Sequence, residues 1–177
     1  MPGATQHYER AFDLYLRARG VAYVRVEEAR RVLLPVGRPA PSANLKFFDY
    51  VVYGTGEHLL VELKGRRLPA GVVGGRSARL ECWATEADVA SLARWEALFG
   101  APFVAVIVFV YWCGSAPPGA LFQEVFEAEG RWYAARAVRV GDYAAHMRAR
   151  SARWRTVDLP PADFERISYP FAPGRAV

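Results

Sequence analysis

The sequence predicts an α/β fold in which a mixed central sheet is flanked by helices. Residues 5–19 and 85–99 each carry apolar side chains at the spacing of an amphipathic helix. The segments at 45–53 and 58–64 are rich in β-branched and aromatic residues and are joined through a glycine-containing turn, which indicates a β-hairpin. Residues 102–112 are apolar on both faces, as expected of a central strand that helices cover on either side.

The first predicted helix ends at Gly20, and a strand at 21–28 follows it, so the predicted order of elements is α-β-β-β-α-β. Glu9 lies at the edge of the apolar stripe of this helix. It precedes Asp13 by one turn and Arg17 by two turns on the same side. An exposed i,i+4 charge pattern explains Asp13 and Arg17.

Prolines and glycines at positions 35, 37, 39 and 41 predict a loop after the strand at 21–28. Arg30 and Arg31 enter this loop. Two interpretations of these arginines stay open, because they could contact phosphate or cover the edge of the sheet.

The hairpin carries three charged residues, Asp49, Glu62 and Lys64, among apolar neighbours. Side chains alternate between the two faces of a strand, so Glu62 and Lys64 share a face. A connecting loop of two or four residues places Asp49 opposite Glu62 on that face, whereas a loop of three residues places it opposite Val61. We expect an even loop and therefore a cluster of all three charges.

Such charges indicate a site, because an unpaired charge in an apolar strand is costly to bury. The alternative is an exposed hairpin with a simple Glu-Lys pair, but its flanking residues are too apolar for a solvated ribbon. Two carboxylates beside an ammonium group suit a hard divalent cation. Mg²⁺ binds through one or two carboxylates together with water and phosphate oxygens, and it promotes phosphodiester hydrolysis.

The pattern of Asp49 followed later by Glu62-Leu63-Lys64 resembles the motif of the PD-(D/E)xK nuclease superfamily. The resemblance implies a restriction-endonuclease-like αβββαβ core with a mixed central sheet. It also implies that Asp49, Glu62 and the backbone carbonyl of Leu63 hold Mg²⁺, for which Mn²⁺ can substitute. Lys64 would then orient the attacking water or offset developing negative charge. A helix-borne glutamate often assists in this superfamily, which makes Glu9 a fourth catalytic candidate.

A narrower resemblance begins at residues 7–12, His-Tyr-Glu-Arg-Ala-Phe. This segment is similar to the start of an uncharacterised bacterial family described by a His-Tyr-Glu-x-Ala-Phe-Glu motif, with Asp13 in place of the final glutamate. Phe48 stands where the superfamily usually has proline before the metal-binding aspartate. The resemblance continues along the chain and implies that these segments form one module; it includes 27–31, 48–49, 62–66 and 154–156.

The second predicted helix starts with Thr85-Glu-Ala-Asp88, which has the pattern of a capping box, and ends before Gly100. In the superfamily the start of this helix commonly brings a polar residue near the metal, so the resemblance makes Thr85 a candidate site residue. The alternative is that Thr85 acts only as the helix N-cap.

Basic residues give the chain a net charge of +5. One group follows the hairpin in a predicted loop at 65–75 and beyond, and a second group surrounds Trp154. Clusters of this kind attract a polyanion, although the preference for arginine over lysine is also typical of a biased nucleotide composition. The predicted nucleic-acid-binding residues are those of the first group: Arg66, Arg67, Arg76 and Arg79. The second group consists of Arg148, Arg150, Arg153 and Arg155.

We expect residues 1–113 to form the nuclease-like core and residues 114–177 to form an extension packed on the same domain. The extension is predicted to hold a β-hairpin at 121–126 and 131–140 and a short helix at 143–150. Trp154 is either a platform for base stacking or a core anchor. The second role is favoured, because large aromatic side chains are usually buried.

These patterns predict a metal-dependent nuclease that hydrolyses DNA, with branched or repair intermediates as candidate substrates. The alternative is a nucleic-acid-binding or assembly module that keeps the fold without turnover. Two cysteines outside any Cys/His cluster indicate neither zinc nor a disulfide framework. No apolar run reaches 18 residues and the N-terminus lacks a signal-peptide pattern, so we expect a cytoplasmic protein without membrane contact. Fold analogy with junction resolvases makes a homodimer a further expectation.

Overall fold

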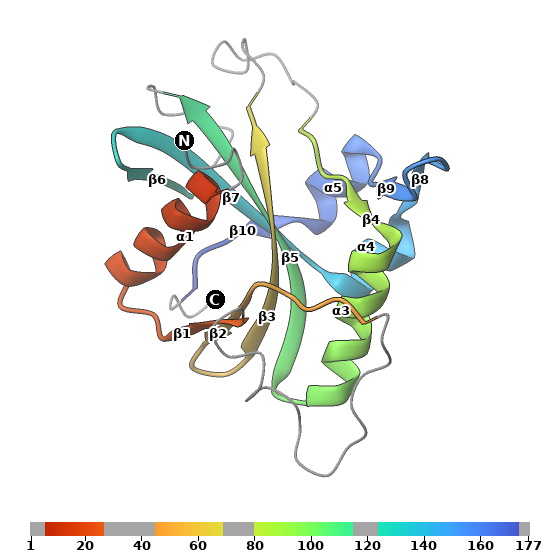
Figure 1. The fold of residues 1–177 in the computed structure, drawn as a ribbon, viewed down its shortest axis with the longest axis horizontal. Coiled ribbons are helices and arrows are strands. Elements are labelled where there is room, and N and C mark those ends of the chain that lie inside the picture. The colour runs from red at the N-terminus through yellow and green to blue at the C-terminus, as the bar shows by residue number, and fades with distance from the viewer. Residues whose placement is uncertain (1–5, 27–44, 69–79, 115–123, 174–177) are drawn as a thin grey trace.

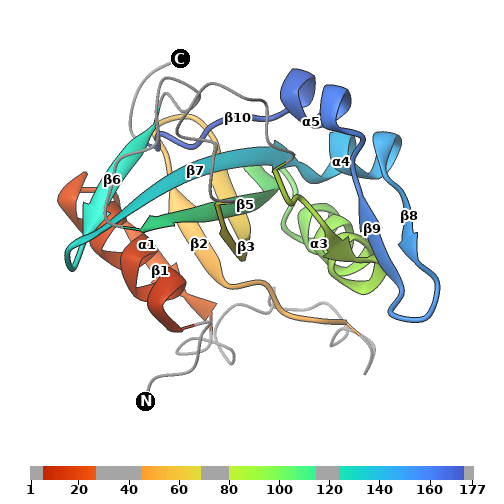
Figure 2. The same cartoon turned by 90° about the horizontal axis from the view of Figure 1, so that it is seen from above.

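A computed structural model of the protein describes residues 6–26, 45–68, 80–114 and 124–173. Within these residues a seven-stranded sheet separates helix α1 on one face from α3, α4 and α5 on the other (Figures 1 and 2). The helices are α1 (Gln6–Ala18), α3 (Glu86–Phe99), α4 (Val140–His146) and α5 (Pro161–Ile167). The strands are β1 (Tyr23–Arg25), β2 (Tyr50–Tyr53), β3 (His58–Arg67), β4 (Ala84–Thr85), β5 (Phe103–Gly114), β6 (Val125–Ala128), β7 (Arg131–Arg139), β8 (Arg148–Ser151), β9 (Thr156–Asp158) and β10 (Tyr169–Pro170).

The main sheet has the strand order β1-β2-β3-β5-β7-β10, and β6 pairs with β7. Strands β3 and β5 are parallel, and the other neighbours in this sheet are antiparallel. The sheet is therefore mixed, as predicted, and most of its strand pairs are antiparallel. No helix among the described residues is long and apolar enough to cross a membrane.

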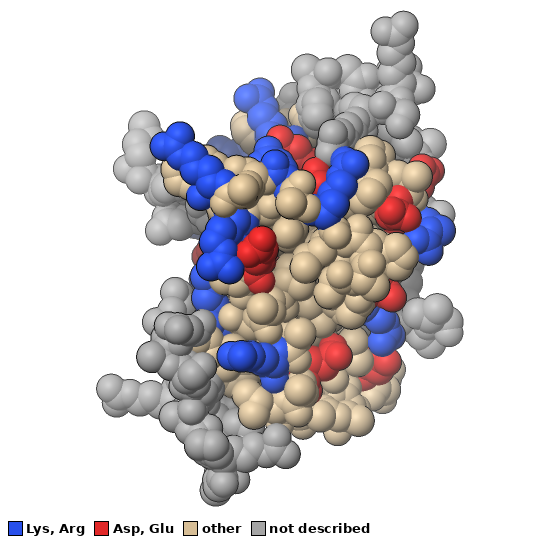
Figure 3. Space-filling view, turned by 90° about the vertical axis from the view of Figure 1, so that its right-hand side faces the viewer, with Lys and Arg blue, Asp and Glu red and all other residues tan. Residues whose placement is uncertain are grey.

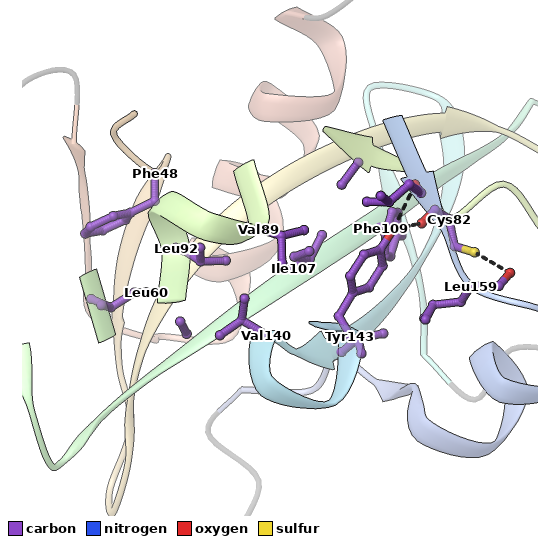
Figure 4. Packing of buried hydrophobic residues seen from close by; sticks show 14 of the residues in the cluster. Phe48, Leu60, Cys82, Val89, Leu92, Ile107, Phe109, Val140, Tyr143 and Leu159 are labelled. Carbon is purple, nitrogen blue, oxygen red and sulfur yellow. Dashed lines mark hydrogen bonds between the residues drawn. The ribbon is translucent and has the colours of Figure 1, made fainter. Parts of the chain in front are cut away.

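Strand β5 lies at the centre, between β3 and β7, and contributes to a core on each face of the sheet. Ile107 and Phe109 point toward α3 and α4, where Val89 and Tyr143 pack around them (Figure 4). The alternate residues of β5, such as Val108, pack with the apolar stripe of α1 on the other face. The two-faced apolar run in the sequence is thus explained by burial on both sides.

The structure corrects the predicted extent of the first two strands. β1 covers only Tyr23–Arg25, and β2 begins at Tyr50 rather than at residue 45. The segment before β2 is drawn to α3, where Phe48 packs edge-on against Trp95 with ring centroids 5.6 Å apart. Phe48 therefore joins the core that contains Val51, although strict alternation along one strand would put residues 48 and 51 on opposite faces.

Strand β3 is longer than predicted, because its parallel pairing with β5 continues to Arg67 opposite Trp112. Residues 65–67, which were expected in a loop, belong to this strand. The rest of that predicted loop lies largely outside the described residues.

The C-terminal part contains the predicted hairpin, observed as β6 and β7, and β7 lies beside β5 in the main sheet. The predicted helix at 143–150 is wrong in its bounds. Helix α4 begins earlier, and its last predicted turn is instead β8, which pairs with β9. A second sheet has the order β4-β9-β8 and adjoins the start of α3. The division into a core of residues 1–113 and an extension of 114–177 stays a prediction.

Candidate metal-dependent nuclease site

Two carboxylates face each other across the β2–β3 hairpin. Tyr53 pairs with His58, so the loop has an even length, residues 54–57, as predicted. The register that pairs Tyr50 with Val61 brings the preceding residue, Asp49, to the level of Glu62. The Asp49 backbone N–H donates to the Val61 carbonyl at 2.8 Å, which keeps the chain on this register just before β2 starts.

The Asp49 side chain is fixed by the backbone of β3, since its Oδ2 accepts a hydrogen bond of 2.7 Å from the Leu63 N–H. The N–H and C=O of one strand residue lie on the same side of the strand, so the Leu63 carbonyl is directed to the same edge as Asp49. Two members of the predicted ligand set, Asp49 and this carbonyl, therefore lie at the same edge of β3.

Burial makes both carboxylates unusually basic. Burial raises the pKa of Asp49 to about 6, and the negative charges of Glu9 and Asp88 raise it as well. The hydrogen bond from Leu63 and the positive charge of Lys64 lower this pKa but do not outweigh the rise. Burial likewise raises the pKa of Glu62 to about 7, with a further rise from the charge of Asp49. The site thus disfavours two negative charges close together, which is the situation that a bound cation relieves.

Lys64 lies between two carboxylates. Its Nζ is 2.7 Å from Glu62 Oε1 and 2.8 Å from Asp88 Oδ2. Burial lowers the pKa of Lys64, but the charges of Glu62 and Asp88 outweigh burial, and the net pKa is raised above its ordinary value. Lys64 is accordingly an ammonium group at neutral pH.

Asp88 is a site residue that the sequence analysis assigned only to a capping box. Its side chain accepts from the Thr85 N–H at 3.0 Å, while the Thr85 hydroxyl accepts from the Asp88 N–H at 3.1 Å. Burial raises the pKa of Asp88, but Lys64 and the Thr85 hydrogen bond outweigh it and hold the pKa well below its usual range. The predicted cap is confirmed, and it also delivers a carboxylate to Lys64.

A second lysine, which the sequence analysis did not single out, meets the same carboxylate. Lys46 Nζ lies 3.0 Å from Asp88 Oδ1 and 3.4 Å from the Thr85 hydroxyl. The backbone of Lys46 is held by α3, because its N–H donates to Ser91 Oγ and its carbonyl accepts from the Trp95 indole. Positions 46 and 64 hold the only lysines in the sequence, a pattern that could have pointed to Lys46.

Comparison with known proteins identifies the fold that carries this site. No family model matches the sequence, and no curated protein sequence matches it. A solved structure of Hjc, a Holliday junction resolvase from the archaeal hyperthermophile Archaeoglobus fulgidus, is similar over 94% of this chain and 96% of that chain, with a TM-score of 0.52 and 16% sequence identity. The chain has the restriction-endonuclease-like fold. The similarity to the narrower bacterial family stays a prediction.

Glu9, on α1, interacts electrostatically with Asp49. Its Oε2 forms an ion pair of 3.1 Å with Arg25 of β1, and its charge raises the pKa of Asp49. The neighbouring residue, Tyr8, fixes the helix against β3, because a Cβ added at Gly65 would lie 2.3 Å from its ring. The structure therefore places Glu9 within electrostatic range of Asp49, and its catalytic role stays a prediction.

The predicted phosphate-binding arginines differ in their surroundings. Arg66 is only 9% exposed, and its guanidinium donates to the backbone carbonyls of Gly65 and Trp83. This position differs from the expected solvent-facing contact, because the extended β3 carries Arg66 under Trp83. Arg67 is exposed, with its guanidinium 5.3 Å from the Trp112 ring centroid. Four further candidates lie outside the described residues: Arg30, Arg31, Arg76 and Arg79.

The donor set fits a hard divalent cation. The described residues contain no group of three or more His, Cys, Asp or Glu side chains that could hold a metal ion. Mg²⁺ needs fewer protein ligands, since one or two carboxylates with water and substrate oxygens are enough. One oxygen of Asp49 and one of Glu62 have no hydrogen-bond partner within the described chain, which leaves them available for such an ion.

Proposed function

We propose that the protein is a divalent-metal-dependent nuclease that hydrolyses phosphodiester bonds in DNA. The observation that carries this proposal is the partly buried pair of Asp49 and Glu62 with the Lys64 ammonium 2.7 Å from Glu62, built on a restriction-endonuclease-like fold. Paired carboxylates with raised pKa values in a fold of this class support a catalytic site better than a structural ion pair.

In this proposal Asp49, Glu62 and the Leu63 carbonyl hold Mg²⁺, and Mn²⁺ can take its place. The bound ion would stabilise negative charge on the phosphate and lower the pKa of a coordinated water. Because both carboxyl groups carry raised pKa values, they release protons as they bind a cation near neutral pH. Metal affinity should therefore increase as the pH rises toward 7.

Lys64 acts as a charged donor rather than as a base. Its raised pKa keeps it protonated at neutral pH, so it can orient the attacking water or stabilise the developing charge on the phosphate. Asp88 holds the ammonium in place, and Glu9 adds negative charge beside Asp49. Thr85 serves the site indirectly, because its backbone and hydroxyl fix Asp88.

The substrate that we infer is branched DNA. The support is the similarity to Hjc, a Holliday junction resolvase, over nearly the whole length of both chains. The same similarity supports a homodimer as the working assembly, since a four-way junction presents two equivalent strands. A cytoplasmic location fits this substrate and belongs to the same proposal.

A panel of end-labelled DNAs tests the proposal. Duplex, flap, four-way junction and single-stranded DNA of matched sequence are incubated with Mg²⁺, Mn²⁺ or EDTA. We expect cleavage of the branched DNAs with either metal, and none in EDTA or with the Asp49→Asn variant. Binding without cleavage under every metal condition would overturn the enzymatic assignment and favour a binding module that keeps the fold.

A further inference from the structure

The β8–β9 hairpin is attached directly to the start of α3, beside the candidate site. Thr85 of β4 pairs with Thr156 of β9, and the Glu86 N–H donates to the Arg155 carbonyl at 3.0 Å. The Arg155 guanidinium also forms an ion pair of 3.0 Å with Glu86. These contacts join the tip of the hairpin to the helix turn whose Asp88 forms ion pairs with Lys46 and Lys64. Figure 1 shows β9 next to β4, which leads into α3.

The tip of this hairpin displays a large aromatic side chain to solvent. Ser151 pairs with Thr156, and the residues between them form a tight turn in which Trp154 is 69% exposed. This exposure excludes the core-anchor role that the sequence favoured for Trp154. Arg155 adopts a φ of 47°, a left-handed conformation that is strained for a residue other than glycine.

The exposed position of Trp154 does not stabilise the fold. Burial of a large apolar side chain stabilises a fold, and the exposed Trp154 side chain lacks most of this stabilisation. Its ring contact among the described residues is with the neighbouring Arg153, whose guanidinium lies 5.1 Å from the ring centroid. An exposed indole on a tight turn between two paired strands is therefore suited to contact a second molecule.

The charges of the hairpin indicate a polyanion as that molecule. Arg148 and Arg155 form ion pairs with Asp158 and Glu86, so their charges are partly offset. Arg150 and Arg153 have no ion-pair partner among the described residues, and the Arg150 guanidinium lies 5.2 Å from the Trp83 ring centroid. Figure 3 shows this side of the molecule, with basic side chains prominent along its upper and left-hand parts and acidic ones among them.

We propose that the β8–β9 hairpin is a DNA-binding element in which Trp154 stacks on an unpaired base and Arg150 and Arg153 contact phosphates. This inference rests on the proposed function and specifies its substrate. Bases inside a duplex are stacked on each other, so away from the duplex ends an indole face finds a free base face only at a branch, a gap or a single strand. The hairpin therefore selects DNA with unpaired bases.

The geometry places this element close to the candidate site. Trp154 lies in the turn two residues before Thr156, so the two Cα atoms are at most about 7 Å apart. Thr156 pairs with Thr85, and the Thr85 hydroxyl lies 3.4 Å from Lys46 Nζ. The tip of the hairpin is thus attached to the residue that contacts Lys46 and caps the helix at Asp88.

Fluorescence anisotropy with labelled DNA in EDTA tests the inference without turnover. The probes are a blunt duplex, a single strand and a four-way junction with unpaired bases at its centre. For Trp154→Ala we expect about tenfold or greater weakening on the DNAs with unpaired bases and less than about twofold on the duplex. Trp154→Phe should keep most of the affinity, because it keeps an aromatic face. Tyr53→Ala, an exposed aromatic on β2, is the matched control and should leave all affinities unchanged.

The outcomes separate this inference from the proposed function. Trp154-dependent binding by a protein that never cleaves would retain the hairpin and overturn the enzymatic assignment. Cleavage by a protein whose DNA affinity is equal for wild type and Trp154→Ala would keep the enzymatic assignment and overturn the proposed role of the hairpin. Equal weakening on the duplex and on the other probes also overturns the inference. So does a Trp154→Ala variant that only changes from dimer to monomer in sedimentation, because the tip would then be a contact between two copies of the chain.

Discussion

The two oxygens of Asp88 meet two different lysines: Oδ2 lies 2.8 Å from Lys64 Nζ, and Oδ1 lies 3.0 Å from Lys46 Nζ. One capping carboxylate therefore connects the start of α3 to β3 and to the segment before β2. A helix terminus of this kind is usually a local stability feature. Here it also sets the position and the protonation of the candidate catalytic lysine.

Asp88→Asn tests this connection. The amide oxygen can still accept from the Thr85 N–H, so the cap is kept while the charge is lost. Without that charge the pKa of Lys64 falls, and the alkaline limb of the cleavage profile should move to lower pH. Loss of one partner of a buried pair should also lower the free energy of unfolding by about 3 kcal/mol.

The measurement for Asp88→Asn is single-turnover cleavage across pH 6 to 10, together with urea unfolding. Glu86→Gln is the control, because it removes an exposed carboxylate from the same helix turn without contacting Lys64. An alkaline limb that stays in place, whatever the stability, would show that Asp88 does not govern Lys64.

Stability without metal should fall as the pH rises from about 4 to 7. The pKa values of Asp49 and Glu62 are raised in the folded protein, so in this range the folded state binds more protons than the unfolded state. Their stabilising contribution is complete below the unfolded pKa values and is lost as the pH passes through the folded ones. The lowered pKa of Asp88 acts in the opposite direction, but only below about pH 4.

Asp49→Asn should remove much of this pH dependence and stabilise the metal-free protein at pH 7.5 by about 1–3 kcal/mol. Urea unfolding in EDTA at pH 5 and pH 7.5 measures the change. Added Mg²⁺ should raise the melting temperature of the wild type at pH 7.5 but not that of the variant. Equal pH dependence in the two proteins would mean that Asp49 is not a buried carboxylate under strain.

Lys64→Arg should reduce cleavage at least about 100-fold while DNA binding changes little. The larger planar guanidinium cannot occupy the compact position between Glu62 and Asp88 without moving one of them. Lys46→Arg is the matched comparison, since Lys46 is half exposed and has room for a longer side chain. Cleavage near the wild-type rate by Lys64→Arg would mean that any cation suffices at this position.

Arg67→Ala and Arg66→Ala should have different effects despite their adjacent positions. Arg67 is exposed, so its loss should weaken DNA binding and reduce the log-log salt slope by about 0.9 if it contacts one phosphate. Arg66 is buried under Trp83 and bonded to backbone carbonyls, so its loss should lower the melting temperature and leave the slope unchanged. Salt titrations of DNA binding on the same duplex and thermal melts of both variants test whether each arginine contacts phosphate or stabilises the fold.

The sequence predicted those parts of the site that depend on local rules. Alternation along the strands and an even hairpin loop were enough to bring Asp49 to the level of Glu62. The capping box at Thr85 was also visible, because it needs only two residues three apart. The contact between Asp88 and Lys64 was not predictable, since it depends on how α3 packs across β3.

Two residues were misjudged because the extent of an element was unknown. Arg66 was expected at the surface, but β3 continues through it and places it beneath Trp83. Trp154 was expected to be buried more often than not, but it occupies a tight turn between two short strands. In both cases the exposure of the side chain depends on strand pairing with distant segments, and patterns in a single sequence do not reveal this pairing.

The absence of a side chain at Gly65 has a consequence for engineering. The ring of Tyr8 rests on this glycine, one residue beyond Lys64, and the next residue of the helix is Glu9. The gap between α1 and β3 is therefore adjustable from a position that carries no charge. A series of alanine, serine and valine at position 65 would move α1 away from β3 in small steps. It would thereby change the electric field of Glu9 at Asp49 without removing any ionisable group of the site.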